Sequence, residues 1–398
     1  MTEEILRVAA KGDGVTASGR FVAGAAPGDH VAEDGALTWG PHHAAPPCRH
    51  YGTCGGCQLQ HLDDEMLAGF VAERVRNAAN GQDLQPQKVA PPHLSPPASR
   101  RRATLHAARV SGRIAIGFRE GGSHKLVDLG ECPVLVPELS RLIAPLRKLL
   151  AARDGRLAVD IDMALAEQGV DASIKGLTVE GLQQTEAMLD FARDNGLARL
   201  ALDQGYGPEA LWEPEPVTVL LGGLSVPLPP GAFLQATADG EAALAQAATD
   251  WLGGLPVVAD LFSGLGTFAF ALAKGKTKVL AVEADRAAYL ACKGAGGRAQ
   301  LQVHCLHRDL FRNPLLPDEL NKFSGVLLDP PRAGARDQIE RLAQSTVARI
   351  AYISCNPVSW ARDAVTLLAG GYRLAELRPV GQFRWSTHVE LASLFVKG

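Results

Sequence analysis

From residue 231 onward, short apolar stretches alternate with stretches of helical spacing. Four of these stretches have the length and character of buried strands: Val257–Phe262, Val279–Glu283, Gly325–Asp329 and Ala348–Ile353. Strands that alternate with helices are typical of a doubly wound, mostly parallel sheet. In such a sheet, ligands bind outside the carboxyl ends of the strands. We therefore expect an α/β fold, with its chemistry in the loops that follow these strands.

The residues before 231 divide into two further regions. Between residues 100 and 230, short segments such as Ile114–Phe118 and Leu157–Ile161 alternate apolar and polar positions between Gly and Pro residues. This pattern favours a central antiparallel α+β domain. Residues 1–47 are rich in Gly, Ala and Pro, which predicts a short N-terminal β segment. We therefore expect three parts: residues 1–47, a central domain over 48–230, and an α/β domain over 231–398.

Two segments in the first part of the central region have patterns of their own. Apolar residues from Met66 to Val75 recur at helical spacing behind the capping candidate Asp63. This predicts a helix over residues 63–80, which is a candidate to pack on the α/β domain. Residues 82–99 contain many prolines and are predicted to form a linker.

Composition places the chain among ordinary globular proteins. Its 398 residues are 46% hydrophobic and 21% charged, with a formal net charge of −3. The acidic start lacks the apolar run of a secretory signal, so we expect a cytoplasmic protein with no membrane contact. The apolar stretch Leu255–Ala273 contains Asp260, Gly264 and Gly266, and it predicts a strand, a turn and a helix rather than a membrane span.

The chain has seven cysteines, and this odd number argues against a disulfide framework. Cys48, Cys54 and Cys57 lie within ten residues of one another, and Cys132 precedes a proline. Four thiolates suit an iron–sulfur cluster or a structural zinc ion. A redox pair is a third option, although it leaves Cys48 unexplained. Spacing alone does not choose between cluster and zinc.

The first strand of the α/β domain leads into a glycine turn, Gly264-x-Gly266-x-x-Ala269. Glycines allow the backbone to approach a ligand closely, and this spacing also fits a dinucleotide site. Glu283 ends the next strand, where a carboxylate accepts ribose hydroxyls of NAD or of S-adenosylmethionine. Asp309 follows the third strand region and is a candidate for contact with the adenine amine. For both acids the alternative is a solvated loop charge.

Two later loops carry the most reactive candidates. The fourth strand ends in Asp329-Pro330-Pro331-Arg332, where the prolines stiffen the loop and orient the carboxylate. Cys355 follows the next strand, and a thiol at that position suggests a covalent step. The alternative is a buried structural cysteine, since free cysteine is often buried.

These motifs together resemble a known family, the RNA uracil-C5 methyltransferases that form 5-methyluridine, and specifically the iron–sulfur type acting on 23S ribosomal RNA. The resemblance runs from about Leu6 to the C-terminus. It is carried by Cys48-x5-Cys54-Gly-Gly-Cys57, Ile116-Gly117-Phe118-Arg119, Cys132-Pro133, Ser354-Cys355-Asn356-Pro357 and His388-Val389-Glu390-Leu391.

The resemblance implies a class I methyltransferase domain with a Rossmann-like sheet, and a reduced RNA-binding barrel at the N-terminus. It implies that Cys48, Cys54, Cys57 and Cys132 hold a [4Fe-4S] cluster. It further implies that six residues contact S-adenosylmethionine: Gln235, Phe262, Thr267, Glu283, Asp309 and Asp329. The family often has Asn at the position of Thr267 and, two residues after the glutamine, at the position of Thr237.

The implied reaction is methylation of uridine at C5. Uracil C5 is a poor nucleophile, and attack of Cys355 at C6 makes C5 reactive. Glu390 matches the base that removes the C5 proton, and its alternative is an ordinary edge carboxylate. The target base must leave its stack, so we expect a single-stranded or flipped uridine in RNA. The expected enzyme is a 23S rRNA (uracil-C5)-methyltransferase.

Three alternatives stay open at this point. The same chemistry on transfer RNA is one, an NAD-dependent oxidoreductase with an iron–sulfur accessory site is the second, and a non-catalytic RNA-binding scaffold is the third. For the RNA surface we expect residues 98–125, which hold seven basic side chains against one acidic side chain. Phe118 and Phe383 are candidates to stack on bases, and core packing is their alternative. We expect a monomer.

Overall fold

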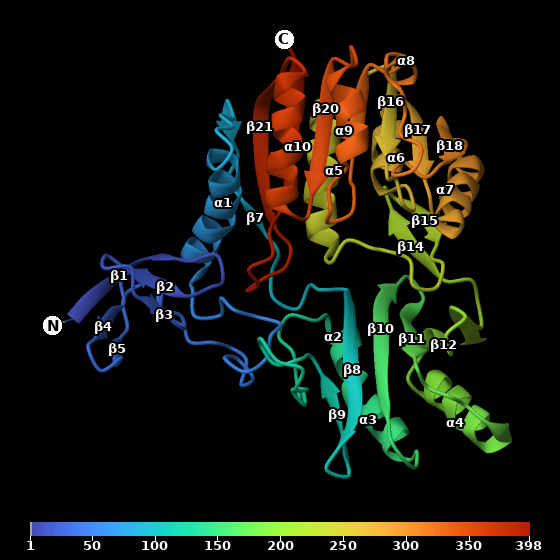
Figure 1. The fold of residues 1–398 in the computed structure, drawn as a ribbon. Coiled ribbons are helices and arrows are strands. Elements are labelled where there is room, and N and C mark those ends of the chain that lie inside the picture. Colours follow the sequence, from blue (N-terminus) through green and yellow to red (C-terminus); the bar gives the residue numbers. More distant parts are fainter. Residues whose placement is uncertain (1) are drawn as a thin grey trace.

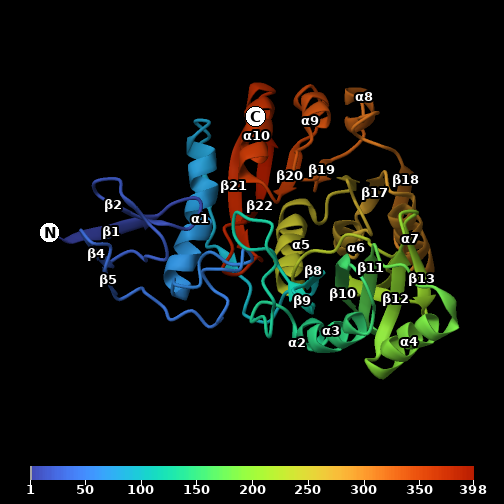
Figure 2. The ribbon, with the colours of Figure 1, turned by 60° about the horizontal axis from the view of Figure 1, so that its bottom comes forward.

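The computed structural model describes residues 2–398, which form the parts shown in Figure 1. A large sheet flanked by helices occupies the upper half of that view. A second sheet lies below it, and the N-terminal strands lie to one side. Figure 2 shows the same parts with the lower sheet turned forward.

The large sheet contains the four predicted strands in parallel. Its strands are β16 (Val257–Leu261), β17 (Lys278–Glu283), β18 (Val303–His307), β19 (Gly325–Leu328), β20 (Arg349–Ser354), β21 (Tyr372–Gly381) and β22 (Glu390–Lys397). They are ordered β18-β17-β16-β19-β20-β22-β21, and β22 runs antiparallel to both of its neighbours. Counted from β16 as the first strand, this order is 3-2-1-4-5-7-6. Dinucleotide-binding sheets have the order 3-2-1-4-5-6. The antiparallel β22, which lies between β20 and β21, therefore distinguishes this sheet from them.

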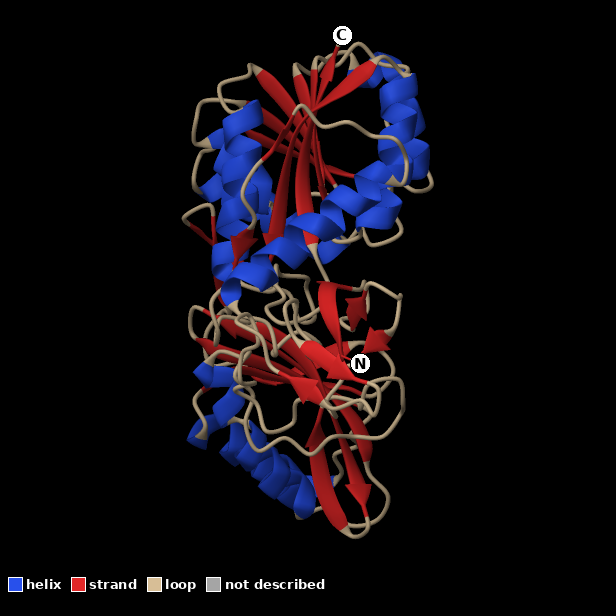
Figure 3. Cartoon of the chain, turned by 90° about the vertical axis from the view of Figure 1, so that its left-hand side faces the viewer, coloured by secondary structure: helices blue, strands red, loops and turns tan. Residues whose placement is uncertain are grey.

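Helices cover both faces of this sheet, as Figure 3 shows. They are α5 (Ala238–Leu252), α6 (Thr267–Ala273), α7 (Arg286–Arg298), α8 (Pro317–Leu320), α9 (Arg336–Ala343) and α10 (Pro357–Ala369). Successive residues of a strand point to opposite faces. On β16, Val258 accordingly packs in a core with α5, α6 and α7, whereas Ala259 and Leu261 pack in a core with α9 and α10. The predicted doubly wound α/β fold is therefore confirmed.

The predicted helix and linker both pack on the large sheet. Helix α1 (Asp64–Asn80) begins where the Asp63 side chain accepts a hydrogen bond from the backbone N–H of Met66, at 2.8 Å. Its apolar side chains share a core with α10 and β21. The linker contains β6 (Lys88–Val89) and β7 (His93–Leu94), which pair in parallel with β21. The segment 82–99 therefore extends the sheet edge in addition to connecting domains.

The central domain is a six-stranded sheet with helices packed against it. Its strands are β8 (Arg102–Val110), β9 (Arg113–Gly117), β10 (Ala158–Ala166), β11 (Gly169–Lys175), β12 (Leu197–Asp203) and β13 (Pro208–Trp212), and its helices are α2 (Pro137–Arg141), α3 (Ile143–Ala151) and α4 (Gly181–Asp194). The antiparallel prediction is wrong for one pair. Strands β11 and β12 are parallel because α4 carries the chain back between them.

Two smaller units complete the molecule. The N-terminal segment forms a five-stranded sheet of β1 (Thr2–Val8), β2 (Gly14–Thr16), β3 (Phe21–Val22), β4 (His30–Ala32) and β5 (Leu37–Thr38). The hairpin of β14 (Thr218–Leu221) and β15 (Leu224–Pro227) shares a core with α5 and α6. Among residues 2–398, no helix combines the length and the apolar character needed to cross a membrane.

Candidate active site and cysteine pocket

A pocket of about 630 Å³ opens at the carboxyl ends of β16, β17, β18, β19 and β20. Its volume lies within the usual range for small-molecule sites, roughly 300–1,000 Å³. The eight predicted catalytic and cofactor-binding residues all line it: Gln235, Phe262, Thr267, Glu283, Asp309, Asp329, Cys355 and Glu390. These positions are distant in the sequence, and the fold brings them to one place.

The glycine turn forms the floor of this pocket. Phe262, directly after β16, has a φ of +64°, which is uncommon for a bulky residue. Gly266 has a φ of +95°, and a Cβ there would lie 2.7 Å from the Cys292 Sγ. A side chain at Gly266 would therefore clash with the packed core below the turn. Helix α6 then begins at Thr267, inside the pocket.

Glu283 holds the two loops that flank it. Its carboxylate accepts hydrogen bonds from the backbone N–H groups of Gly264 at 2.8 Å, Ala284 at 2.8 Å and Asp285 at 2.7 Å. A carboxylate has about four acceptor positions, so one remains for a ligand. Asp309 similarly caps its own turn by accepting from the backbone N–H of Phe311 at 2.9 Å. Both acids are therefore structured parts of the pocket wall.

The two reactive loops are tied to each other. The Asn356 side chain donates to the Arg332 carbonyl at 3.1 Å and also caps the N-terminus of α10 by accepting from Val358. Cys355 lies between β20 and α10 and is half-buried in the pocket. The loop that follows Asp329 and the loop that carries Cys355 therefore form one wall.

Burial raises the pKa values of two ionisable side chains in this wall. Burial raises the pKa of Glu390 to about 7, although a hydrogen bond from Gln382 and the charge of Arg102 oppose the shift. Burial also raises the pKa of the Cys355 thiol, and the neighbouring carboxylates Glu390 and Asp329 raise it further. The side chain of Cys355 is therefore a thiol at neutral pH, and it has to lose its proton during the reaction. A base with a pKa near 7 suits proton transfer at neutral pH.

Sequence reasoning missed Gln382, which is only 1% exposed and lies directly after β21. Its Nε2 donates to Oε1 of Gln235 at 2.8 Å, and the Gln235 Nε2 donates to Oδ2 of Asp329 at 3.3 Å. One signal in the sequence could have found it. Gln382 is a polar residue at the end of β21, and β21 pairs with β22, the strand that carries Glu390. Burial lowers the pKa of His388, and the charge of Arg332 lowers it further.

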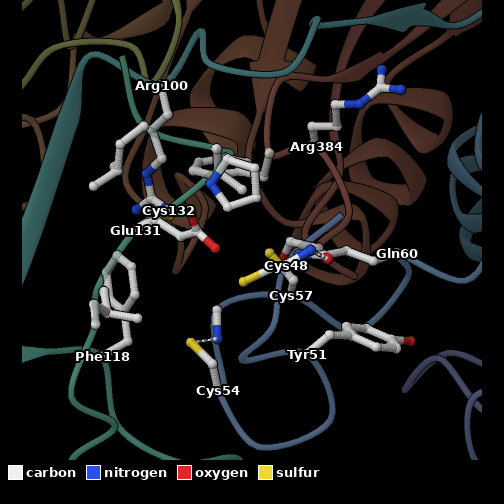
Figure 4. Close-up of a pocket in the computed structure, with 17 residues that line it drawn as sticks. Cys48, Tyr51, Cys54, Cys57, Gln60, Arg100, Phe118, Glu131, Cys132 and Arg384 are labelled. Carbon is white, nitrogen blue, oxygen red and sulfur yellow. Dashed lines mark hydrogen bonds between the residues drawn. The ribbon is translucent and has the colours of Figure 1, made fainter. Parts of the chain in front are cut away.

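A second pocket, of about 20 Å³, contains the four predicted cluster cysteines (Figure 4). Cys48, Cys54 and Cys57 come from one loop, and Cys132 comes from the segment between β9 and α2. The Gly56 N–H points at the Cys54 Sγ, at 3.5 Å. Burial raises the pKa of Cys57 to about 12, and the neighbouring cysteines contribute to this shift. These thiols therefore lie close together, and all four cysteines are half-buried.

No group of three or more His, Cys, Asp or Glu side chains within residues 2–398 is arranged to hold a single metal ion. The two aromatic candidates lie at this pocket, because Phe118 and Phe383 both line it. Phe118 also packs against the core of the central domain, as its alternative states, whereas Phe383 has the Arg100 guanidinium over its ring, 5.6 Å from the centre. Coordination of a metal by the four cysteines stays a prediction.

The predicted basic surface is partly used inside the protein. The Arg101 Nη2 lies 2.6 Å from the Glu241 carboxylate in a buried pair, and Arg109 donates to the backbone carbonyl of Gly155. Arg102 lies over the ring of Phe233, 4.4 Å from its centre, at the pocket mouth. The number of basic side chains that face solvent between residues 98 and 125 is thus smaller than the sequence suggests.

Comparisons with known sequences give consistent results. A family model described as tRNA (Uracil-5-)-methyltransferase matches residues 307–397. An uncharacterized RNA methyltransferase of Zymomonas mobilis is 47% identical over 396 residues, covering 99% of this chain and 100% of that protein. A 23S rRNA (uracil(1939)-C(5))-methyltransferase of Edwardsiella ictaluri is 33% identical over 369 residues, covering 90% of this chain and 83% of that protein.

A solved structure is similar over the whole chain. The Pyrococcus abyssi tRNA (uracil-54, C5)-methyltransferase, in complex with S-adenosyl-L-homocysteine, superposes with a TM-score of 0.75. The two chains are 22% identical, and the match covers 100% of each. This similarity supports the fold, including the arrangement of the two sheets.

Proposed function

The chain belongs to the RNA uracil-C5 methyltransferase family, and from this premise we propose that it methylates C5 of a uridine in 23S ribosomal RNA through a covalent adduct of Cys355. The observation that carries the proposal is the meeting of Cys355, Glu390 and the glycine turn in one pocket. Neither the antiparallel β22 nor the family supports the oxidoreductase alternative.

S-Adenosylmethionine fits the large pocket and supplies an electrophilic methyl group on its sulfonium. Gln235, Phe262, Thr267, Glu283, Asp309 and Asp329 are the residues that would hold it. The fit rests on Gly264, which lines the pocket with open space where a side chain would stand, and on the acceptor position left on Glu283. Because that carboxylate is already fixed by three N–H groups, it presents this position without reorganising.

Cys355 and Glu390 divide the chemistry between them. Cys355 gives up its thiol proton to solvent and adds as a thiolate to C6 of the uracil ring, which makes C5 an enolate carbon. C5 takes the methyl group from the sulfonium, and S-adenosylhomocysteine is the leaving group. Glu390 then removes the C5 proton, and the thiolate is expelled as the C5–C6 double bond forms again. General-base assistance of this kind contributes about 10²–10⁴-fold to the rate.

The choice of 23S ribosomal RNA follows the Edwardsiella relative, which matches 90% of this chain. The family model and the Pyrococcus structure carry transfer-RNA descriptions, so a transfer-RNA uridine is the second candidate. Mapping 5-methyluridine in ribosomal and transfer RNA from cells that lack this gene distinguishes the two. We further propose that the protein acts as a cytoplasmic monomer.

We propose that the four cysteines hold a [4Fe-4S] cluster with a structural role. In such a cluster four cysteine thiolates are the ligands, so they do not have to converge on one ion as the ligands of zinc do. The buried guanidinium of Arg100 faces Cys132 and Cys57 and complements the negative charge of thiolate ligands.

The test of the reaction uses RNA that contains 5-fluorouridine, together with S-adenosylmethionine. Fluorine at C5 is not removed as a proton, so the wild-type protein is expected to accumulate as a covalent protein–RNA adduct. Cys355→Ala is expected to form none, and Cys305→Ala, which changes a cysteine outside the pocket lining, is expected to behave as wild type. A non-catalytic scaffold would give no adduct with any variant.

A further inference from the structure

A buried amide links the proposed base to the proposed cofactor contacts. The Gln382 side chain faces the Glu390 carboxylate, and its Nε2 donates to the Gln235 Oε1 at 2.8 Å. The Nε2 of Gln235 in turn donates to Oδ2 of Asp329 at 3.3 Å. Residues from β22, the segment before α5 and the end of β19 are therefore connected through Gln382.

The orientation of this amide is determined by the backbone. The Gln382 Oε1 accepts a hydrogen bond from the backbone N–H of Thr237 at 3.3 Å. Since that oxygen is engaged, the NH₂ group must face the other way, toward Gln235 and Glu390. The Gln235 Oε1 faces Gln382 for the same reason, which leaves its NH₂ group for Asp329.

Packing holds Gln382 at this position. A Cβ added at Gly240, in the first turn of α5, would lie 2.7 Å from the Gln382 Cβ. The Thr237 side chain caps the same turn by accepting from the Gly240 N–H at 3.1 Å. The start of α5 therefore approaches Gln382 at a distance that only glycine permits.

The Gln382 amide thus donates to Gln235 and faces Glu390, and the proposed reaction needs both of these residues. We propose that Gln382 is a positioning residue, whose single amide orients the base Glu390 and the cofactor-binding side chain Gln235 together. Proton removal and cofactor binding then depend on the same buried group. This inference rests on the proposed function, because it assigns Glu390 and Gln235 their roles in that reaction.

The test compares Gln382→Met with Gln338→Met. Methionine keeps the length of the side chain and removes the amide. Gln338 is also 1% exposed, and it exchanges two hydrogen bonds with the backbone of Leu315, outside the pocket lining. The control therefore removes the amide of a buried glutamine in the same domain and leaves the hydrogen bonds that join Gln382, Gln235 and Asp329 unchanged.

The first readout is binding of S-adenosylhomocysteine, measured by calorimetry without turnover. Gln382→Met is expected to weaken binding about tenfold, because Gln235 loses the partner that orients it. Gln338→Met is expected to bind as wild type. Equal affinity in the two variants would overturn the link from Gln382 to the cofactor site.

The second readout is the pH dependence of tritium release from RNA that carries [5-³H]uridine. Glu390 faces Arg102, Asp329 and Cys355 as well as Gln382, and none of those three is changed. Loss of the amide donor is expected to move the acid limb of the profile up by about one pH unit in Gln382→Met. An acid limb that coincides with that of Gln338→Met would overturn the proposal.

These outcomes are separable from failure of the proposed function. A wild-type protein that releases no tritium from any RNA would contradict the reaction itself. A wild-type protein that releases tritium, together with a Gln382→Met profile that matches the control, would contradict only the role of Gln382.

Discussion

The two pockets of this molecule are built in different ways. The large pocket lies at the carboxyl ends of five parallel strands, and its residues come from loops that strand pairing holds in place. The cysteine pocket is formed by the loop 48–60, by segments of the central domain and by the loop 383–386. The first site is positioned by a sheet, whereas the second joins segments that no sheet connects.

One loop touches both pockets. The Trp385 carbonyl accepts hydrogen bonds from the backbone N–H groups of Gln58 at 2.8 Å and Leu59 at 2.9 Å, next to the cysteines. Phe383 and Ser386 line the cysteine pocket, and Glu390 follows in the large pocket. The comparison teaches that the cysteine loop supports the segment leading to the base, so separate measurements on the two pockets show how far damage to one reaches the other.

The largest expected effect is loss of the cluster in Cys132→Ser. Removal of one of four ligands is expected to abolish bound iron and its visible absorbance, and to lower the melting temperature by several degrees, because ligand binding contributes to folding. Cys355→Ser is the matched variant in the other pocket, and it is expected to retain iron. Iron content and thermal unfolding check both, and iron loss from Cys355→Ser would mean that the pockets are not independent.

Glu390→Gln comes next, with an expected fall in tritium release of about 10²–10⁴-fold. The variant is expected to keep forming the bond between Cys355 and RNA, because addition does not require the C5 proton to leave. Accumulated adduct on denaturing gels would separate a lost base from a collapsed pocket. If turnover stayed at the wild-type rate, Glu390 would be only an edge carboxylate.

The pH dependence of the wild-type protein gives a smaller effect. Burial raises the pKa of Glu390 to about 7, and a base acts only when it is deprotonated. Tritium release is therefore expected to fall as the pH drops through 7, by about tenfold between pH 8 and pH 6. Single-turnover rates measure this fall. An acid limb near pH 4.5 would show that burial does not control the base.

The smallest effect is expected for Glu283→Gln. An amide NH₂ would face backbone donors that now bind carboxylate oxygens, so the loops on both sides of the pocket would shift. We expect affinity for S-adenosylhomocysteine to fall about fivefold to tenfold, with iron content unchanged. Calorimetry measures the affinity, and an unchanged value would place Glu283 outside the cofactor site.

Much of the fold could be predicted from the sequence because its signals are local. The strands β16, β17, β19 and β20 follow the predicted apolar stretches, and Asp63 caps α1 as its residue type suggests. The parallel pairing of β11 with β12, and the addition of β6 and β7 to β21, were not visible. A strand of two residues is too short to show an alternating pattern in the sequence. β6 and β7 are strands only because they pair with β21.

The site shows the same division. Cys355 and Asp329 are recognisable because each follows a buried strand, and strand ends are where this fold places chemistry. Gln382 lacks such a mark, since its importance comes from contacts with residues 147 positions away in the chain. Arg101 was assigned to a surface, yet it is buried against Glu241, because a helix far along the sequence covers it.

The sequence by itself determined the strand–helix alternation, the glycine turn and the order of the reactive side chains, since each depends on neighbouring residues. Tertiary structure alone decided which side chains meet, how deeply Glu390 is buried and which arginines stay free. Burial and hydrogen bonding depend on atoms brought together from distant parts of the chain, and those atoms set the charge state on which the chemistry depends.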